Sequence, residues 1–262
     1  LYASKTRNET IMLMKSLDGL FNDFFWGFVW NGTGWSNHTK FHAGPASTIA
    51  RRWYDGCYLN NGDFLYVYGN DALNNNFVYF RIWNGTVWTG NITANSNIGG
   101  IPNYIDVECR SDANEAIVAI LDTSNDVNTL FFNNTNGYTT NSWGFLFEHT
   151  ATNPDIRFEA IDLQWSNNDT SRGAFVFVNG TSPDVAIGKI WNSTNGNLTW
   201  SDGFISPKFG TVGDVIVRAH PNNETFNNSF FTAFGLASLA DPAQIRAFLI
   251  HNYTPAFSTI LD

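Results

Sequence analysis

One four-residue step recurs five times along this chain, each time where a hydrophobic run ends. It joins an aromatic or histidine side chain to Asn-x-Thr, and its asparagines lie 53, 49, 59 and 60 residues apart. A period of about 50 residues with four extended runs is typical of a β-propeller, because a single four-stranded sheet buries its faces only when neighbouring sheets stack against it. The asparagines of the step are Asn31, Asn84, Asn133, Asn192 and Asn252.

The repeat predicts an all-β protein, a β-propeller of about five four-stranded blades. The second strand of each repeat is a short run rich in aromatic and β-branched residues between Asn, Asp and Gly clusters. Only a few residues precede the second strand of the first repeat, so we expect the first blade to be incomplete in this chain: residues 1–4 are the stub of its first strand, or the ring closes without it. We expect one domain, 1–262, with repeats at roughly 1–48, 49–100, 101–152, 153–208 and 209–262.

Each fourth strand is expected to carry a second aromatic side chain. These residues are Trp35, Trp88, Tyr138, Trp200 and Phe257.

The composition describes an ordered protein whose surface is polar and largely uncharged. The chain has 23 Phe, 10 Trp and 9 Tyr, only 14% charged residues and a net charge of −9. Phosphate binding needs clustered Lys and Arg, so nucleic acid is a poor partner. No run approaches the roughly 20 apolar residues of a membrane helix. The chain opens at Leu1 without Met or a signal peptide, and we interpret it as a piece of a longer protein whose targeting segment or anchor is absent.

The repeated step has two compatible interpretations. Asn-Gly between two strands is the strongest short-range hairpin signal, because a type I′ turn needs positive φ at both central residues. Every step is also an N-x-[ST] acceptor for N-glycosylation, and hairpin tips are accessible. Further acceptors lie at Asn8, Asn37, Asn91, Asn168, Asn179, Asn197, Asn223 and Asn227. We therefore expect several of these asparagines to carry sugar in an extracellular or cell-surface protein.

The two cysteines, Cys57 and Cys109, lie 52 residues apart at the same point of the first strand in successive repeats. They would face each other across neighbouring blades, so a disulfide is one expectation in an oxidising compartment. Two buried apolar thiols are the alternative. A redox or metal role is disfavoured because neither cysteine belongs to a C-x-x-C.

Charged residues alternate along the first strands, which are innermost in a propeller. Asp106, Glu108 and Arg110 share one face of a strand, and equivalent positions in the next two repeats hold Asp162, Gln164, Asp214 and Arg218. We expect these seven side chains to gather near the central channel. There they pair between blades, since buried carboxylates are tolerated when paired, or they hold a cation or small polar ligand.

No motif indicates catalysis or a cofactor. The histidines show no zinc-ligand spacing, and the sequence contains no nucleophile elbow or phosphate-binding glycine loop. Loops such as 122–126 and 167–169 are rich in Asp and Asn, which ordinary turn chemistry explains, with Ca²⁺ binding as the alternative. We therefore predict a protein that is not an enzyme and has no cofactor.

The unit Arg-Ile-Trp-Asn-Gly-Thr-x-Trp-Thr at 81–89, echoed at 189–191, resembles the propeller repeats of prokaryotic, often archaeal, extracellular and cell-surface proteins. It is also distantly similar to the repeats of sialidase-type and lectin propellers. Sialidases of that type have an S-x-D-x-G-x-T-W box and an arginine triad. The segment 111–114 does not complete the box, and Arg51, Arg110 and Arg218 are not identified as a triad by their sequence context.

The primary functional prediction is an extracellular, N-glycosylated propeller that serves as a structural or adhesive component of a cell-surface assembly such as a filament, sheath or surface layer. Its partners would be other copies of itself or other surface proteins. A glycan-binding lectin module is the first alternative, with pockets built from aromatic faces of the repeats. A propeller-fold glycoside hydrolase or lyase is the second.

Overall fold

The computed structural model shows a protein built almost entirely of β-strands. It describes residues 1–17, 23–43, 52–69, 76–124, 126–150, 159–167, 170–178, 185–194, 197–208, 214–219, 229–237, 244–251 and 257–261. Two single 3₁₀ turns, η1 (Asn134–Asn136) and η2 (Thr140–Ser142), are the helical elements of these ranges. No helix in the described part of the chain is long and apolar enough to cross a membrane.

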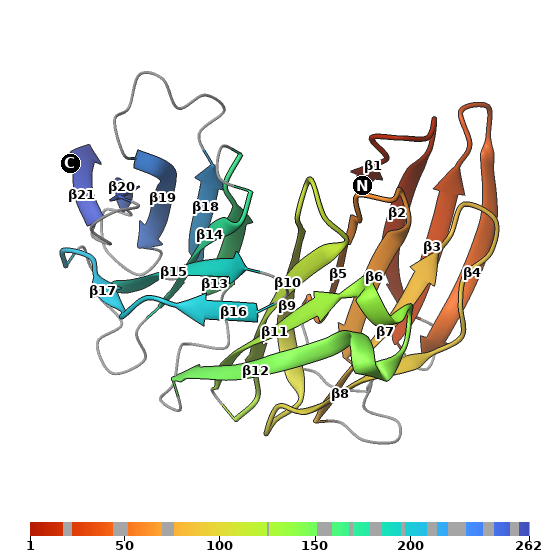
Figure 1. Ribbon diagram of the computed structural model, residues 1–262, viewed down its shortest axis with the longest axis horizontal. Helices are drawn as coiled ribbons and strands as arrows, with labels where there is room; N and C mark the ends of the chain where they lie inside the picture. Colours follow the sequence, from red (N-terminus) through yellow and green to blue (C-terminus); the bar gives the residue numbers. More distant parts are fainter. Residues whose placement is uncertain are drawn as a thin grey trace.

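The strands form five antiparallel sheets, which we call blades I to V (Figure 1). Blade I contains β1 (Tyr2–Ala3), β2 (Thr10–Leu17), β3 (Asp23–Trp30) and β4 (Trp35–Ala43). Blade II contains β5 (Tyr54–Tyr58), β6 (Phe64–Gly69), β7 (Phe77–Trp83) and β8 (Ile92–Asn97). Blade III contains β9 (Pro102–Cys109), β10 (Glu115–Asp122), β11 (Val127–Asn133) and β12 (Trp143–Thr150).

Blades IV and V complete the series. Blade IV contains β13 (Ile161–Trp165), β14 (Arg172–Val178), β15 (Ala186–Thr194) and β16 (Asn197–Trp200), and β17 (Phe204–Ile205) also pairs with β15. Blade V contains β18 (Asp214–Ala219), β19 (Ser229–Ala237), β20 (Gln244–His251) and β21 (Phe257–Leu261). In each blade successive strands are neighbours, which is the up-and-down order of a propeller blade. The predicted all-β propeller of five four-stranded blades is confirmed, and the incompleteness expected of blade I is limited to β1, an innermost strand of two residues.

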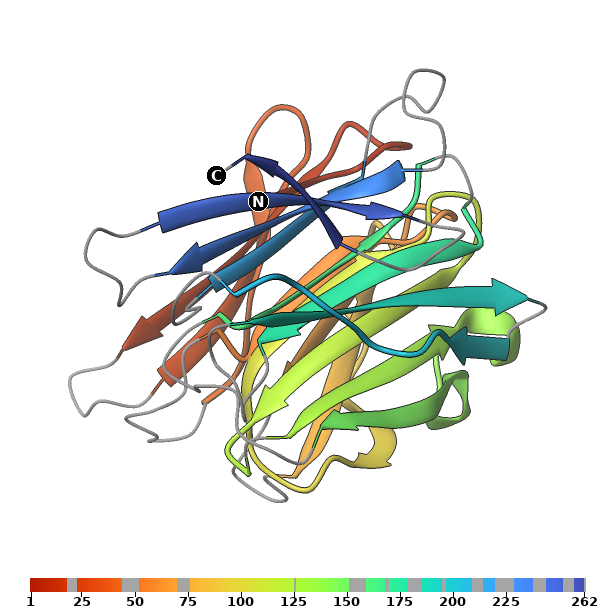
Figure 2. The ribbon, with the colours of Figure 1, turned by 90° about the vertical axis from the view of Figure 1, so that its left-hand side faces the viewer.

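The blades stand in an arc, with blade V at the left end and blade I at the right end of Figure 1, and Figure 2 shows the same arc seen from the side of blade V. Three hydrophobic clusters join them. One lies between blades I and II, one between blades II and III, and one runs through blades III, IV and V. Every residue of β6 and β10 is buried, because each of these strands is covered on both faces.

An aromatic pair closes the hairpin between the third and fourth strands of a blade. The ring centroids are 5.7 Å apart in Trp30–Trp35, 5.5 Å in Trp83–Trp88 and 5.7 Å in Trp191–Trp200. Trp30–Trp35 and Trp191–Trp200 are strand partners, where aromatic pairs stabilise a sheet. Trp83 and Trp88 form an isolated bridge, so the prediction that Trp88 lies on the fourth strand was wrong, because β8 begins only at Ile92.

Blade III follows the same rule with a different residue from the one that we predicted. Trp143 lies opposite Phe132, with ring centroids 5.1 Å apart, and Tyr138 lies in the connection between the strands. The prediction of Tyr138 was wrong because this connection contains η1 and η2, so the fourth strand begins later in the sequence. The fourth-strand position of Phe257 in blade V agrees with β21, but its side chain lies outside the described residues.

Candidate functional site

The tips of two hairpins present the asparagine of the repeated step to solvent. The Asn84 side-chain oxygen accepts the backbone N–H of Thr86 and of Val87, both at 3.0 Å, and the Thr86 hydroxyl at 2.8 Å. Asn31 makes the same three bonds with Thr33 and Gly34. The next residue is glycine in both turns, with φ of 90° at Gly32 and 92° at Gly85. The predicted type I′ turn is wrong, because neither Asn31 nor Asn84 has positive φ; the asparagine side chain closes the turn instead. Both asparagines are exposed, so their amide nitrogens are accessible at a fixed turn.

The other acceptor asparagines differ in accessibility. Asn133 caps η1, and its amide donates to Glu115 at 3.4 Å. Asn192 is half-buried within β15, whereas Asn8, Asn91 and Asn197 are exposed. The side chain of Asn37 and the predicted sites Asn168, Asn179, Asn223, Asn227 and Asn252 lie outside the described residues.

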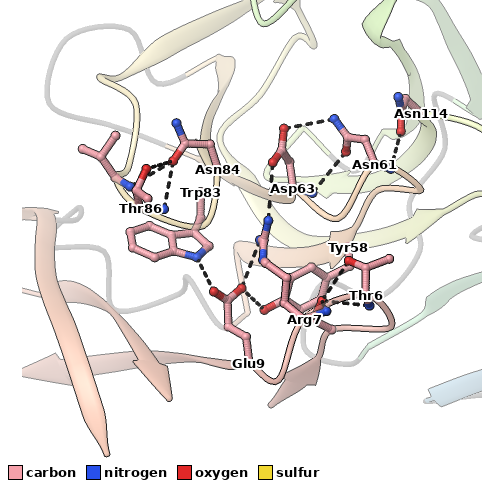
Figure 3. A network of polar contacts seen from close by, with 12 residues as sticks. Thr6, Arg7, Glu9, Tyr58, Asn61, Asp63, Trp83, Asn84, Thr86 and Asn114 are labelled. Atoms are coloured by element: carbon pink, nitrogen blue, oxygen red, sulfur yellow. Dashed lines mark hydrogen bonds and ion pairs between the residues drawn. The ribbon is translucent and has the colours of Figure 1, made fainter. Parts of the chain in front are cut away.

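The buried carboxylate of Glu9 links blade I to blade II beside the hairpin that carries Asn84 (Figure 3). Glu9 accepts the Tyr58 hydroxyl at 2.8 Å and the Trp83 indole N–H at 2.9 Å, both from blade II. Arg7 binds the same carboxylate at 3.1 Å and approaches Asp63 of blade II at 3.7 Å. The indole that precedes Asn84 is therefore held by the neighbouring blade, which fixes the hairpin that carries the acceptor.

The junctions between blades II and III and between blades III and IV each contain an acid at the equivalent position. This acid lies just before, or at the start of, the second strand of the blade. Asp63 accepts the hydroxyl of Tyr138 from blade III, which explains the position of that tyrosine in the long connection. Glu115 accepts the hydroxyl of Ser193 from blade IV at 3.0 Å and an Arg110 N–H at 2.8 Å. The sequence analysis did not identify these acids. Their common position in the repeats is the one sequence feature that could have identified them.

The innermost strands are joined by a ladder of aspartates. Asp55 accepts the backbone N–H of Val107 at 3.0 Å, and Asp106 accepts that of Leu163 at 3.1 Å. Asp162 accepts the N–H of Val217 in the same way. Each aspartate thus binds the inner strand of the next blade, and the hydroxyl of Tyr2 in blade I completes the ladder by donating to Asp55.

Arginines offset part of this acidic charge. Arg52 lies 3.4 Å from Asp55 and 3.7 Å from Asp106, and it also pairs with Glu159. Arg218 binds Asp162 at 2.9 Å. Arg52 and Arg218 therefore pair with acids that belong to neighbouring blades.

Two acids near the axis are shifted towards their protonated forms. Burial raises the pKa of Glu108 to about 8, and the charges of Asp55 and Asp162 add to that shift against the opposing effects of Arg218 and Lys5. Burial and the same two carboxylates also raise the pKa of Asp106. Perturbed acids of this kind occur at functional sites and in structural ion-pair networks alike.

The predicted channel cluster is only partly brought together. Asp106, Glu108, Asp162 and Arg218 lie in one electrostatic network. Arg110 instead pairs with Asp112 at 2.7 Å and with Glu115, at the hairpin end of blade III. Asp214 accepts the backbone N–H of Glu159 at 3.0 Å, and Gln164 lies half-buried on β13. Asp55, Arg52 and Glu159 belong to the network but were absent from the prediction.

Cys57 and Cys109 form a disulfide between the inner strands of blades II and III. Their Cα atoms are 5.6 Å apart, which is the usual distance for such a bond. The bond lies two residues beyond the contact between Asp55 and Val107, so it continues the same line of links between the blades.

Turn chemistry accounts for the described part of the Asp-rich loop at 122–126. Asp122 is fully buried and accepts the backbone N–H groups of Gly100, Ser124 and Asp126 at 2.9–3.1 Å. Burial raises its pKa to about 6. Within the described ranges no three His, Cys, Asp or Glu side chains are grouped in a way that could hold a metal ion.

A hollow of about 280 Å³ lies beside the long connection of blade III. Its rim combines aromatic rings with amide and hydroxyl groups and contains no charged side chain; it is lined by Phe131, Asn133, Thr135, Asn136, Asn141, Ser142, Trp143, Gly144 and Phe145. Phe145 is 47% exposed and has a φ of 52°, a left-handed conformation that non-glycine residues rarely adopt. Strained backbone of this kind concentrates at functional sites.

Comparisons with known proteins find similar folds but identify no family for this chain. No family model matches the chain, and no curated protein matches it. The structure of the SapL1 lectin in complex with α-methyl fucoside is similar with a TM-score of 0.51 at 11% identity, over 98% of this chain and 81% of that one. The WD40 domain of Toxoplasma gondii coronin is similar with a TM-score of 0.51 at 8% identity, over 91% of this chain and 55% of that one.

A bacterial sialidase is also among the similar structures. The chain matches NanB sialidase from Streptococcus pneumoniae with a TM-score of 0.49 at 7% identity, over 85% of this chain. It spans about a third of that protein's length, 34%. The similarity to the SapL1 lectin and the WD40 domain is one of fold alone, at identities of 11% and 8%.

Proposed function

We propose that this chain is an extracellular, N-glycosylated adhesive propeller that binds uncharged glycans in the hollow of blade III. The observation that carries the proposal is the composition of the rim, in which an exposed phenylalanine stands beside three asparagines. The proposal joins the adhesive role expected from the sequence to its lectin alternative.

The chemistry of the rim suits a neutral sugar. A pyranose has an apolar face of C–H groups, which packs on an aromatic ring, and a set of hydroxyls that bind amides. Phe145 supplies the exposed ring, while Asn136 and Asn141 are exposed amide side chains on the adjoining 3₁₀ turns. Small-molecule sites are typically hollows of this kind with a few convergent polar groups, starting at about 300 Å³. The size suits one or two sugar rings.

The extracellular setting is supported by covalent chemistry. The disulfide between Cys57 and Cys109 persists in oxidising compartments, and the exposed acceptors Asn31 and Asn84 are of use only on the secretory or surface route. With a net charge of −9 the protein is a poor match for nucleic acid.

The proposed activity is binding without turnover. Glycoside hydrolysis ordinarily needs a pair of carboxyl groups that flank the scissile bond. No Asp or Glu belongs to the described lining of the hollow, and the described inner-strand aspartates are engaged by backbone N–H groups of the next blade.

A glycan array followed by titration with free monosaccharides tests the proposal. We expect neutral glycans to bind, and Phe145→Ala to weaken binding about tenfold, or roughly 1.4 kcal/mol. Ile205→Ala is the matched control, because Ile205 is 63% exposed on blade IV and does not line the hollow. Equal losses in both variants, or an array without signal, would contradict glycan binding. Release of product from a panel of chromogenic glycosides would contradict the absence of turnover.

A further inference from the structure

A second aromatic surface lies next to the hollow of blade III. Phe145 lines the hollow, whereas Phe147, further along β12, is 41% exposed and is not part of that lining. The ring of Phe145 lies 6.2 Å from that of Phe131, which belongs to the cluster that joins blades III, IV and V. The ring of Phe147 lies 6.2 Å from that of Trp200, which packs against the same cluster. Both phenylalanines therefore face blade IV.

Blade IV contributes a tryptophan and a lysine to this surface. The Trp200 ring meets the His149 ring edge-on at 4.5 Å, and the His149 ring lies 4.7 Å from that of Phe147. The Nζ atom of Lys189, on β15, lies 5.1 Å from the centre of the Phe147 ring. Trp200 and Lys189 are half-buried. We call these four side chains, Phe147, His149, Lys189 and Trp200, the shelf between blades III and IV.

Lys189 has no acidic partner within the part of the chain that the structure describes. There its ammonium forms no hydrogen bond or ion pair, and it contacts the face of the Phe147 ring. Burial lowers the pKa of Lys189, and the charge of the exposed Asp202 opposes that shift. A cation that has lost part of its hydration gains more from an oxygen ligand than a fully solvated cation does.

Lys189 is also the one cation of the shelf. Burial and the charge of Lys189 lower the pKa of His149 to about 3, so the imidazole is neutral at pH 7. The His149 Nε2 atom lies 2.9 Å from the Thr129 hydroxyl, which holds the ring in place between Phe147 and Trp200. The shelf thus combines three rings with a single positive charge.

This combination suits a sugar unit that has a carboxylate. The C–H groups of a sugar ring pack on aromatic side chains, and a lysine ammonium binds a carboxylate as a point charge. Polymers of phosphate need clustered cations instead. The Cα atoms of Phe145 and Phe147 are at most about 7 Å apart, because two residues span no more than that. Adjoining rings of one oligosaccharide can therefore contact the hollow and the shelf together.

We propose that the shelf binds an acidic sugar unit, of the uronic acid type, next to the uncharged unit in the hollow. The inference rests on the proposed glycan binding and names its ligand class, an oligosaccharide in which a neutral and an acidic unit adjoin. The net charge of −9 repels acidic ligands over most of the molecule, so the preference for a carboxylate depends on Lys189.

Titration of matched oligosaccharides tests the proposal. The probes are pairs of di- and trisaccharides that differ in one unit, glucose against glucuronic acid or galactose against galacturonic acid. We expect the 262-residue chain to bind the acidic member of a pair about five- to tenfold more tightly at low salt, with a smaller preference at high salt.

Lys189→Met removes the charge and keeps most of the length of the side chain. This variant should lose the preference for the acidic member and bind the neutral member as the wild type does. Lys189→Arg retains the charge and should retain the preference. Lys5→Met is the matched control, because Lys5 is exposed between β1 and β2 of blade I and its loss changes the net charge equally. Circular dichroism and thermal unfolding confirm that each variant is folded.

The outcomes separate this inference from the proposed function. Binding of the neutral members without a preference for the acidic ones would overturn the inference and leave the proposed function standing. Equal effects of Lys189→Met and Lys5→Met would overturn it as well, because a general charge effect would then explain the preference. Binding of neither member of any pair would contradict the proposed function and this inference together.

Discussion

Replacing Glu108 by glutamine should stabilise the protein at pH 9 and leave its stability at pH 5 almost unchanged. The carboxyl lies half-buried near the axis, and burial with the charges of Asp55 and Asp162 raises its pKa from 4.5 to about 8. A raised carboxyl pKa means that the folded state favours the protonated form. The contribution of Glu108 to stability is therefore complete below about pH 4.5 and is lost as the pH rises through 8.

The size of the effect follows from the shift. At 1.36 kcal/mol for each pKa unit, the change in the free energy of unfolding is at most about 5 kcal/mol. Glu108 is not fully buried, so solvent screening reduces this value, and we expect roughly 2–4 kcal/mol. Glutamine has the shape of the protonated acid and cannot ionise. The variant should keep a smaller dependence on pH, because the pKa of Asp106 is raised by the same surroundings.

Urea unfolding at pH 5, 7 and 9, followed by tryptophan fluorescence, measures the effect. Asp112→Asn is the control, because Asp112 is exposed and its pKa is lowered by Arg110 and Thr170. Its contribution is present above its ordinary pKa and is lost only in acid, so this variant should keep the wild-type slope between pH 5 and 9. A Glu108→Gln protein that loses stability from pH 5 to 9 as steeply as the wild type would refute the reasoning.

Three further measurements test the hairpins, the acceptors and the disulfide. Gly85→Val should cost about 1–2 kcal/mol of unfolding free energy because valine resists positive φ, whereas Gly90→Val, in open space at an ordinary φ, should cost less; equal costs would contradict the turn assignment. Peptide mapping of the native protein should find sugar on Asn84, which is exposed, and none on Asn133, whose amide binds Glu115 and which lines the hollow. Replacing both cysteines by serine should lower the free energy of unfolding by about 4 kcal/mol, since the bond closes a loop of 52 residues; an unchanged urea midpoint would contradict this.

The hairpins were predictable because they depend on neighbours in sequence. Asn-Gly marks the turn at Asn31 and Asn84, although only the glycine has the positive φ expected of both residues, and the aromatic residues on either side meet directly across the turn. The period of the step then requires five similar sheets. Blade III shows the limit of this reasoning. Two 3₁₀ turns lengthen the connection between its third and fourth strands, so the aromatic residue on the fourth strand is Trp143 and not Tyr138.

The polar links between blades were predictable only in kind. Alternation along an inner strand identified Asp106 and Asp162 as inward-facing, but not that each would bind a backbone N–H of the following blade. Arg52 and Arg7 are close in sequence to Asp55 and Glu9, but nothing near these two acids indicates their partners in the neighbouring blade, which lie about one repeat or more away. The hollow of blade III likewise combines a strand end, two turns and a strained residue.

The sequence by itself determined the repeating unit, its strand order and its turns, because these follow from side-chain alternation and from the backbone freedom of glycine over a few residues. Only the tertiary structure decided which acids pair and which acceptor asparagines are exposed. Those properties depend on how one blade is placed against the next. Contacts across 50 or more residues are set by packing of whole sheets, which no local pattern records.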